Sequence, residues 1–237
     1  MKFLIVITGW NWKDYIEECI KSVLAQTYKD FSVVIIDDGS DDGSFEIANK
    51  YGNIFAVETM TYNQGTFHAR KFAIDVSIKA ELDFDVVVFL DGDDLLLPNA
   101  LEVVEKKYRE ENCLMTYGNW LNQDRIVCGM PLKYEKVIHE NRDYRKDTFR
   151  CTHLRTFKKE LYQKIKWWNP TKSEIESYPD VELLFQMMEM CGEKRIGVIY
   201  EPIYIYNETN PQRTLTRFGK DENGYKEICN RPKNNLL

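Results

Sequence analysis

Carboxylates clustered at the ends of two apolar runs are the residues of this sequence that best fit chemistry. Asp91-Gly92-Asp93-Asp94 follows the run Val-Val-Val-Phe-Leu, and Asp37-Asp38 follows a second run. Crowded carboxylates repel one another, so a cluster costs free energy unless a cation compensates it. Oxygen ligands without His or Cys favour Mg²⁺ or Mn²⁺, ions that also bind substrate phosphates. The first cluster therefore predicts a metal–nucleotide site, with a solvated acidic turn as the alternative.

The elements that must position these carboxylates alternate between strand and helix. Apolar runs predict strands at 3–8, 31–36, 54–57 and 85–90, and helical spacing predicts helices at 13–26, 43–51, 65–79 and 99–109. Pro98 suits the start of the last of these helices. This order predicts an α/β fold with a mainly parallel central sheet and helices on both faces. Ligands of such sheets bind beyond the carboxyl ends of the strands, where both clusters lie.

The pattern is looser after Cys113. We expect a strand at 114–120, helices at 158–165 and 181–190, and strands at 196–206 broken at Pro202. The polar stretch 207–237 is expected to be a loop or tail and a possible mobile lid, which leaves a single domain over 1–206.

The composition excludes several classes of protein. The 237 residues are 43% hydrophobic and 30% charged, with a mean hydropathy of −0.48 and no apolar run near the length of about 20 residues that spans a membrane. The first residues lack the length and cleavage site of a signal peptide. Six scattered cysteines without a CxxC pattern predict reduced thiols in the cytoplasm. Peripheral association with a membrane remains open.

Charge is distributed unevenly along the chain. The net charge is −6, but residues 133–172 contain 12 Lys/Arg against 5 Asp/Glu, a local balance of +7. A basic segment on an acidic protein is consistent with a local anion site. The alternative is a solvated face that carries local ion pairs.

Several motifs of residues 1–100, taken in order, resemble glycosyltransferase family 2, whose inverting enzymes have the GT-A fold. The matching segments are Ile7-Thr8-Gly9-Trp10-Asn11, Ser22 to Tyr28, Val34 to Ser40, Asn63-Gln64-Gly65 with Ala69-Arg70, and Leu90 to Asp94 with Pro98. Their shared order and spacing make the resemblance specific. It implies that residues 1–100 bind a nucleotide sugar and that 101–206 bind the acceptor.

The resemblance also implies roles for single residues in donor binding. Thr8 and Asp38 would hydrogen-bond a uracil, and Trp10, where the family usually has Tyr, would lie against the base. Arg70 would contact the nucleotide, and Asp91 would lie near the ribose. The remaining positions of this segment are Gly92, within the donor site, and Asp93, which would hold the Mn²⁺ or Mg²⁺ that bridges the diphosphate of a UDP-sugar.

Inverting transfer needs a base that deprotonates the acceptor hydroxyl. The family places an Asp at the start of a helix, and Asp180 fits that context, although Pro179 replaces the usual Glu; Glu182 is the second candidate. The alternative for Asp180 is a helix N-cap. Other possible contacts of the diphosphate or the acceptor are His153, Arg155, Arg213 and Arg217.

The expected function is transfer of a hexose from a UDP-sugar to a hydroxyl of a carbohydrate or glycoconjugate. The alternative acceptor is modified phage DNA, bearing hydroxymethylated or already glucosylated bases, which the basic segment with Trp167 and Trp168 allows. The acidic total argues against strong nonspecific DNA binding. A nucleotidyltransferase would need a richer Gly and Lys loop than Gly9 to Lys13. A non-catalytic nucleotide-binding module is a remoter alternative.

Overall fold

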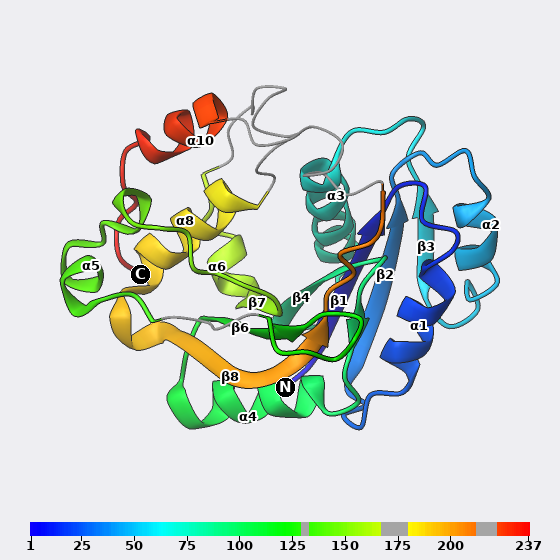
Figure 1. Ribbon diagram of the computed structural model, residues 1–237, viewed down its shortest axis with the longest axis horizontal. Helices are drawn as coiled ribbons and strands as arrows, with labels where there is room; N and C mark the ends of the chain where they lie inside the picture. Colours follow the sequence, from blue (N-terminus) through cyan, green and yellow to red (C-terminus); the bar gives the residue numbers. More distant parts are fainter. Residues whose placement is uncertain (129–132, 167–179, 212–221) are drawn as a thin grey trace.

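The computed structural model describes residues 1–128, 133–166, 180–211 and 222–237 of the chain. Its centre is a sheet of eight strands in the order β3-β2-β1-β4-β7-β6-β8-β5, with helices on both faces (Figure 1). In chain order, the strands are β1 Phe3–Gly9, β2 Phe31–Asp37, β3 Ala56–Thr59, β4 Val86–Asp91, β5 Leu95–Leu96, β6 Met115–Leu121, β7 Arg155–Lys158 and β8 Ile196–Ile205.

The first half is a parallel β-α-β arrangement, as the sequence predicts. Strand β1 pairs in parallel with β2 on one side and with β4 on the other, and β2 pairs in parallel with β3. The register sets Thr8 of β1 beside Asp91 of β4. The carboxyl ends of three neighbouring strands, β2, β1 and β4, therefore meet at one edge of the sheet, where both acidic clusters lie.

Apolar side chains alternate along these strands and build a core layer on each face. One layer packs Leu4, Val6, Val87 and Phe89 against α3 (Thr66–Lys79), α6 (Lys159–Tyr162) and α8 (Val181–Cys191). The other packs Phe3, Ile5, Val88 and Leu90 against α1 (Ile16–Leu24), α2 (Ser44–Asn49) and α4 (Ala100–Glu111). No helix in the described ranges is long and apolar enough to cross a membrane.

Three local predictions in the first half are corrected. The third strand begins at Ala56 and not at Ile54, which lies in a turn after α2 and is exposed. Pro98 precedes the helix and is not its first residue, because Asn99 occupies the N-cap and α4 begins at Ala100. The short strand β5, which pairs antiparallel with β8 directly after the acidic turn, has no counterpart in the predicted elements.

The second half departs from parallel order at β7. This strand runs antiparallel between β4 and β6, while β6 and β8 pair in parallel. Strand β8 is continuous through Pro202, where its register with β6 shifts beside Asn119. A bulge accommodates a proline, which has no N–H to donate to the ladder. Further short helices in the described part of this half include α5 (Lys136–Asn141) and the 3₁₀ turns Tyr144–Lys146 and Glu193–Arg195.

The prediction of a loop or tail after Asn207 is wrong for its last part. Helix α10 (Glu222–Cys229) packs there, and its Ile228 is fully buried in the core layer that contains α8. Asn234 is also buried, and its side chain and backbone N–H donate to Glu189 of α8. The C-terminal residues are therefore part of the fold.

Candidate functional site

The alternation of β1 and β4 sorts the residues at the strand ends onto the two faces of the sheet. Leu4 and Val6 face the layer of α3, so Thr8 faces it too, and Asp91 lies beside Thr8 in register. Asp91 indeed contacts Arg70 of α3 at 2.6 Å. The sequence-predicted donor residues Thr8, Arg70 and Asp91 are thus brought together on one face.

Arg70 joins two candidate site segments. Its side chain is only 3% exposed; Nη2 donates to Asp91 and Nη1 donates to Asp180, while the guanidinium lies 4.5 Å from the centre of the Phe89 ring. Burial opposes the charge, but Asp180 and Asp91 raise the pKa of Arg70 above its usual value. The Nε atom is buried and has no hydrogen-bond partner among the described residues. Arg70 therefore keeps one unused donor in the site.

Asp180 precedes α8 and is held by two arginines. Arg70 binds one carboxylate oxygen, and Nη1 of Arg155 lies 2.6 Å from the other. Asp180 occupies the N-cap position of α8, as the alternative interpretation predicts, but its side chain makes no capping hydrogen bond, so capping does not account for the position of the carboxylate. Burial alone would raise the pKa of Asp180, but the two guanidiniums lower it below the usual value. Asp180 is therefore ionised, the form that a general base requires.

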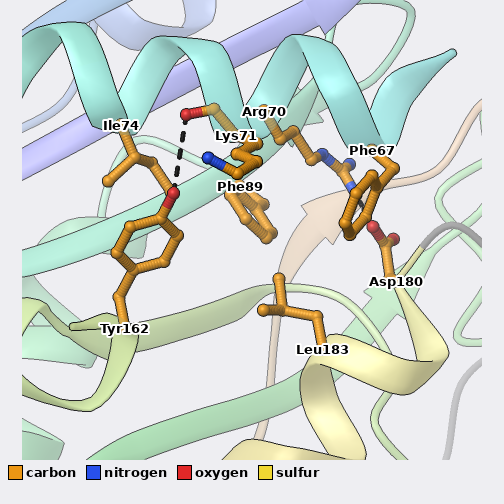
Figure 2. Close-up of a pocket in the computed structure, with 8 residues that line it drawn as sticks. All are labelled: Phe67, Arg70, Lys71, Ile74, Phe89, Tyr162, Asp180 and Leu183. Atoms are coloured by element: carbon orange, nitrogen blue, oxygen red, sulfur yellow. Dashed lines mark hydrogen bonds and ion pairs between the residues drawn. The ribbon is translucent and has the colours of Figure 1, made fainter. Parts of the chain in front are cut away.

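A small pocket separates α3 from the start of α8 (Figure 2). Arg70 and Asp180 close one end of it, and apolar side chains of Ile74, Phe89 and Leu183 line much of the rest. Its volume of about 10 Å³ admits at most one water-sized sphere. The pocket is too small for a sugar ring, so it marks a packing junction behind the ion pairs.

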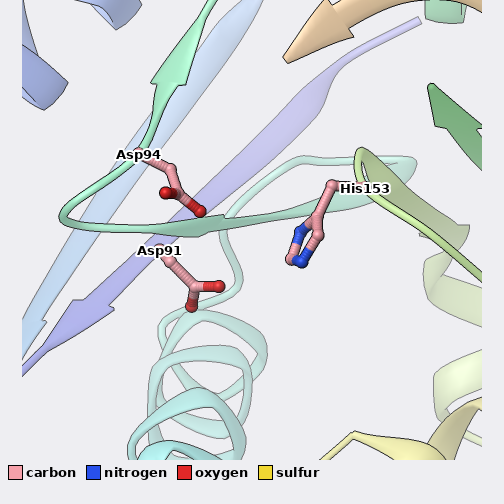
Figure 3. A group of neighbouring side chains, drawn as sticks. All are labelled: Asp91, Asp94 and His153. Atoms are coloured by element: carbon pink, nitrogen blue, oxygen red, sulfur yellow. The ribbon is translucent and has the colours of Figure 1, made fainter. Parts of the chain in front are cut away.

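A second group of side chains converges at the acidic turn (Figure 3). Asp91, Asp94 and His153 each offer an atom within 4.8 Å of the others. The imidazole of His153 stacks on Tyr204, with ring centres 4.7 Å apart, and also on Tyr206. Burial, followed by the charges of Arg155 and Arg70, lowers the pKa of His153 well below its usual value. The neutral imidazole is the form that binds metals, so two carboxylates with one imidazole suit Mn²⁺ better than Mg²⁺, which prefers oxygen ligands alone.

Asp93 and Asp94 of the turn are hydrogen-bonded to the end of β8 and to the segment that follows it. Asp93 accepts a hydrogen bond of 2.7 Å from the side chain of Asn210. Buried Asp94 accepts one from the Tyr204 hydroxyl and one of 2.7 Å from the backbone of Asn207. Burial and the neighbouring Asp93 and Asp91 raise the pKa of Asp94 well above its usual value. Asp93 lies outside the converging group, and its role as the metal ligand stays a prediction.

The residues predicted to face the base lie at the ends of β1 and β2. Asp38 is 3% exposed and accepts the backbone N–H groups of Gln64 and Gly65 at 2.8 and 2.7 Å. Burial outweighs these hydrogen bonds and raises the pKa of Asp38 to about 6. The Thr8 hydroxyl is buried without a partner among the described residues, and Trp10 is half-buried. Asp38 and Thr8 thus offer polar atoms at the strand ends.

Asp37 and Trp12 form a structural unit that the sequence analysis did not predict. Asp37 is fully buried and accepts hydrogen bonds from Trp12 Nε1, Ser40 and Thr59. It points to the opposite face of the sheet from Asp38, as strand alternation requires. The Asp37-Asp38 pair therefore splits into one anchoring residue and one candidate site residue, and alternation along β2 could have indicated this division.

The remaining predicted site residues lie apart from this cluster or outside the described ranges. Glu182 is buried in an ion pair with Arg145 and accepts from Gln186 at 3.1 Å. Those contacts give it a structural role, whereas Asp180 contacts the donor-site residues. Arg213 and Arg217, the possible lid residues, and Pro179, Trp167 and Trp168 fall on positions 167–179 and 212–221, outside the described residues.

Comparison with solved structures shows the GT-A fold. The structure of S. aureus TarS 1–349 in complex with UDP-GlcNAc superposes with a TM-score of 0.73 at 19% identity, over 96% of this chain and 64% of that one. A mannosyltransferase from Pyrobaculum calidifontis, PcManGT, in complex with GDP-Man and Mn²⁺, gives a TM-score of 0.56 at 18% identity, over 96% of this chain and 68% of that one.

Sequence comparison assigns the family. Glycosyltransferase GlyG of Streptococcus pneumoniae is 23% identical over 90% of this chain and 73% of its own length. Chondroitin synthase of Pasteurella multocida is 27% identical over 82% of this chain, which spans only 20% of that enzyme. The family model described as Glycosyl transferase family 2 matches residues 4–166, more than half of the chain. The chain is therefore a glycosyltransferase and belongs to glycosyl transferase family 2.

Proposed function

We propose that this glycosyltransferase moves a hexose from a UDP-sugar to a hydroxyl of a carbohydrate or glycoconjugate, with inversion at the anomeric carbon. The observation that carries the proposal is the bridge made by Arg70 between Asp91 at the end of β4 and Asp180 at the start of α8. It joins the strand ends, where ligands of parallel sheets bind, to an ionised carboxylate. A donor and a base would therefore meet at one place.

The donor would lie across the ends of β2, β1 and β4. Thr8 and Asp38 offer polar atoms for a uracil, and Trp10 a ring for its face. Arg70 and Arg155 supply positive charge beside Asp180, where a departing diphosphate would need it. The complexes of TarS with UDP-GlcNAc and of PcManGT with GDP-Man support a nucleotide-sugar donor.

A divalent cation would be held at the acidic turn. Asp91, Asp94 and His153 converge there, and Asp93 is adjacent in the chain. Such a cation, when bound, neutralises the charge of a diphosphate leaving group. The complex of PcManGT contains Mn²⁺ together with GDP-Man, which supports Mn²⁺ as the ion.

Asp180 would act as the general base. It takes the proton of the acceptor hydroxyl while that oxygen attacks the anomeric carbon, and the bond from that carbon to the diphosphate breaks. One displacement converts an α-linked donor into a β-linked product. A carboxylate held by two guanidiniums is a weak base, so we propose that Arg155, whose side chain is 14% exposed against 3% for Arg70, leaves Asp180 when the donor binds.

The proposed acceptor class is inferred from relatives, some of which are much longer than this chain. The matched relatives include chondroitin and hyaluronan synthases of Pasteurella multocida, of which this chain spans about a fifth. These names support a carbohydrate acceptor. No matched relative named here is described as acting on modified DNA. Several described basic residues of 133–166 are also engaged in ion pairs, which leaves less free positive charge for a DNA backbone: Lys136, Arg145, Lys146, Arg150 and Arg155.

All six cysteines lie in the described ranges as thiols, which supports a reducing compartment such as the cytoplasm.

Replacement of Asp180 by Asn tests this mechanism. We expect Asp180→Asn to abolish sugar transfer from UDP-sugars to a panel of glycan acceptors while UDP binding, measured by calorimetry, is retained. Glu182→Gln is the matched control, and transfer per folded molecule should persist in it. Transfer by Asp180→Asn at the wild-type rate would show that Asp180 is not the base. Binding of UDP without transfer by the wild-type chain would favour the non-catalytic module.

A further inference from the structure

Trp12 is a buried residue that occupies the space of two missing side chains. It is 1% exposed and lies in the core layer of α1 and α4. A Cβ atom placed on Gly9 would lie 2.0 Å from Cε3 of the Trp12 ring, and one on Gly92 would lie 1.5 Å from Cζ3. Both glycines are therefore needed because the indole fills the volume that any side chain there would take.

Two hydrogen bonds fix Trp12 in place, one from its backbone and one from its ring. Its backbone N–H donates to the Ser44 hydroxyl at 2.9 Å, and Nε1 donates to Asp37 at 3.1 Å. The Asp37 carboxylate is itself held by Ser40 and Thr59. The ring thus rests on a buried polar network and cannot shift without breaking it.

Gly92 is the second residue of the acidic turn, and it is held by a hydrogen bond of its own backbone and by contact with the Trp12 ring. Its N–H donates to the Thr8 carbonyl at 3.0 Å, which ties the turn to the end of β1. The indole meets it on the α1 face, and strand alternation then directs Asp91 to the opposite face, where Arg70 binds it. The position of the Gly92 backbone sets where its two neighbouring carboxylates lie.

We propose that Trp12 is a positioning residue for the donor site: its indole fixes the position of the Asp91-Gly92-Asp93 backbone relative to the sheet. The match between a large residue at 12 and glycine at 92 is then a requirement for binding nucleoside diphosphate with its cation. This inference rests on the proposed donor site, but it concerns a residue that is buried against the acidic turn.

A size-swap experiment tests the match. The four proteins are the wild type, Trp12→Leu, Gly92→Ala and the double variant, and calorimetry measures the dissociation constant of UDP in the presence of Mn²⁺. We expect each single variant to bind about tenfold or more weakly. In the double variant, the added methyl enters the volume that the indole has left. Gly92→Ala should therefore cost less than about threefold in the Trp12→Leu background.

Two control variants separate positioning from general damage to the core. A Cβ on Gly118 of β6 would meet its neighbours at 3.4 Å or more, so Gly118→Ala should bind UDP as the wild type does. Phe3→Leu removes a fully buried ring from the same core layer at the far end of β1. It should lower the melting temperature and leave the dissociation constant unchanged.

The outcomes distinguish this inference from the proposed function. Equal penalties for Gly92→Ala in both backgrounds would overturn the positioning role, as would a loss of affinity in Phe3→Leu as large as that in Trp12→Leu. A wild-type protein that binds none of UDP, GDP and dTDP with Mn²⁺ would overturn the proposed donor site itself, and the inference with it.

Discussion

Two buried arginines show how similar ion pairs serve different purposes in this protein. Arg70 and Arg145 each have a side chain that is 3% exposed, and each lies between two carboxylates: Asp91 and Asp180 for Arg70, and Glu182 and Glu189 of α8 for Arg145. All five N–H groups of Arg145 have acceptors: Glu182 and Glu189 each accept two, and the Ile228 carbonyl accepts one. Arg70 donates to Asp91 and Asp180 but has a buried Nε without a described partner.

The carboxylates bound by these two arginines also differ in how far they are exposed. Glu182 and Glu189 are 4% and 0% exposed, whereas Asp180 and Asp91 are 12% and 26% exposed. The network of Arg145 is closed and joins α8 to α10 and the C-terminal residues. The network of Arg70 is open on one side, towards the strand ends. A closed set of hydrogen bonds holds a fold together, and an open set leaves groups for a ligand.

The largest effect on stability is expected at Arg145. Arg145→Met would remove the guanidinium that pairs with two buried glutamates, which would keep only weaker partners such as Gln186 and Asn234, and lower the free energy of unfolding by about 3–5 kcal/mol. Urea unfolding measures this loss. Lys136→Met is the matched control, because Lys136 and Glu140 form an exposed pair and should contribute little. A loss at Arg145 no greater than in the control would remove the distinction between the two networks.

A smaller loss of stability, with loss of function, is expected at Arg70. Arg70→Met leaves Asp91 partly hydrated and Asp180 still paired with Arg155, so we expect about 1–3 kcal/mol in unfolding. UDP binding and transfer should be lost in protein that remains folded at about 20 °C. Arg70→Lys keeps the charge but not the fork that reaches both carboxylates, so it should not restore transfer. Wild-type affinity for UDP in Arg70→Met would contradict the role of Arg70 in the site.

The pH dependence of UDP binding should follow Asp38. Its pKa of about 6 means that the carboxylate that would accept from uracil is lost below that pH. The affinity for UDP should fall about tenfold for each pH unit below 6 and stay level above it. Asp38→Asn should bind weakly without this dependence. An affinity that is constant from pH 5 to 7.5 in the wild type would show that Asp38 does not contact the base.

The smallest effect is a shift in the stability profile at Asp180. Its pKa is lowered in the fold, so its ion pairs contribute fully above the unfolded pKa of about 4, and the contribution is lost as pH falls through the lower folded value. The wild type should thus exceed Asp180→Asn in stability at pH 7, with the difference closing in acid. Arg155→Gln should raise the pKa of Asp180 in the free enzyme and move the acidic limb of kcat/KM to higher pH, because that limb reports groups of the free enzyme.

The grouping of the candidate site residues could be predicted from the sequence, whereas the closed network could not. Thr8, Asp38 and Asp91 lie at or directly after the ends of apolar strands, and a parallel sheet must bring such strand ends together. Their roles in binding stay predictions. The contact between Arg70 and Asp180 crosses 110 positions, and Arg145 reaches Glu182 across 37, so no local pattern could indicate either. The antiparallel β7 and the packing of α10 depend on the same kind of distant contact. The predicted strand began too early at Ile54, because an exposed apolar residue cannot be distinguished from a buried one in an apolar run as short as 54–57.

We expect the ends of β2, β1 and β4 to bind a nucleoside diphosphate with a divalent cation. Thermal unfolding with UDP, GDP and dTDP, each with Mn²⁺ and with EDTA, measures this binding. Saturating UDP with Mn²⁺ should raise the melting temperature by about 5–10 °C, and EDTA or Asp93→Ala should abolish the shift. No shift with any of the three nucleotides, or an equal shift in EDTA, would contradict the account.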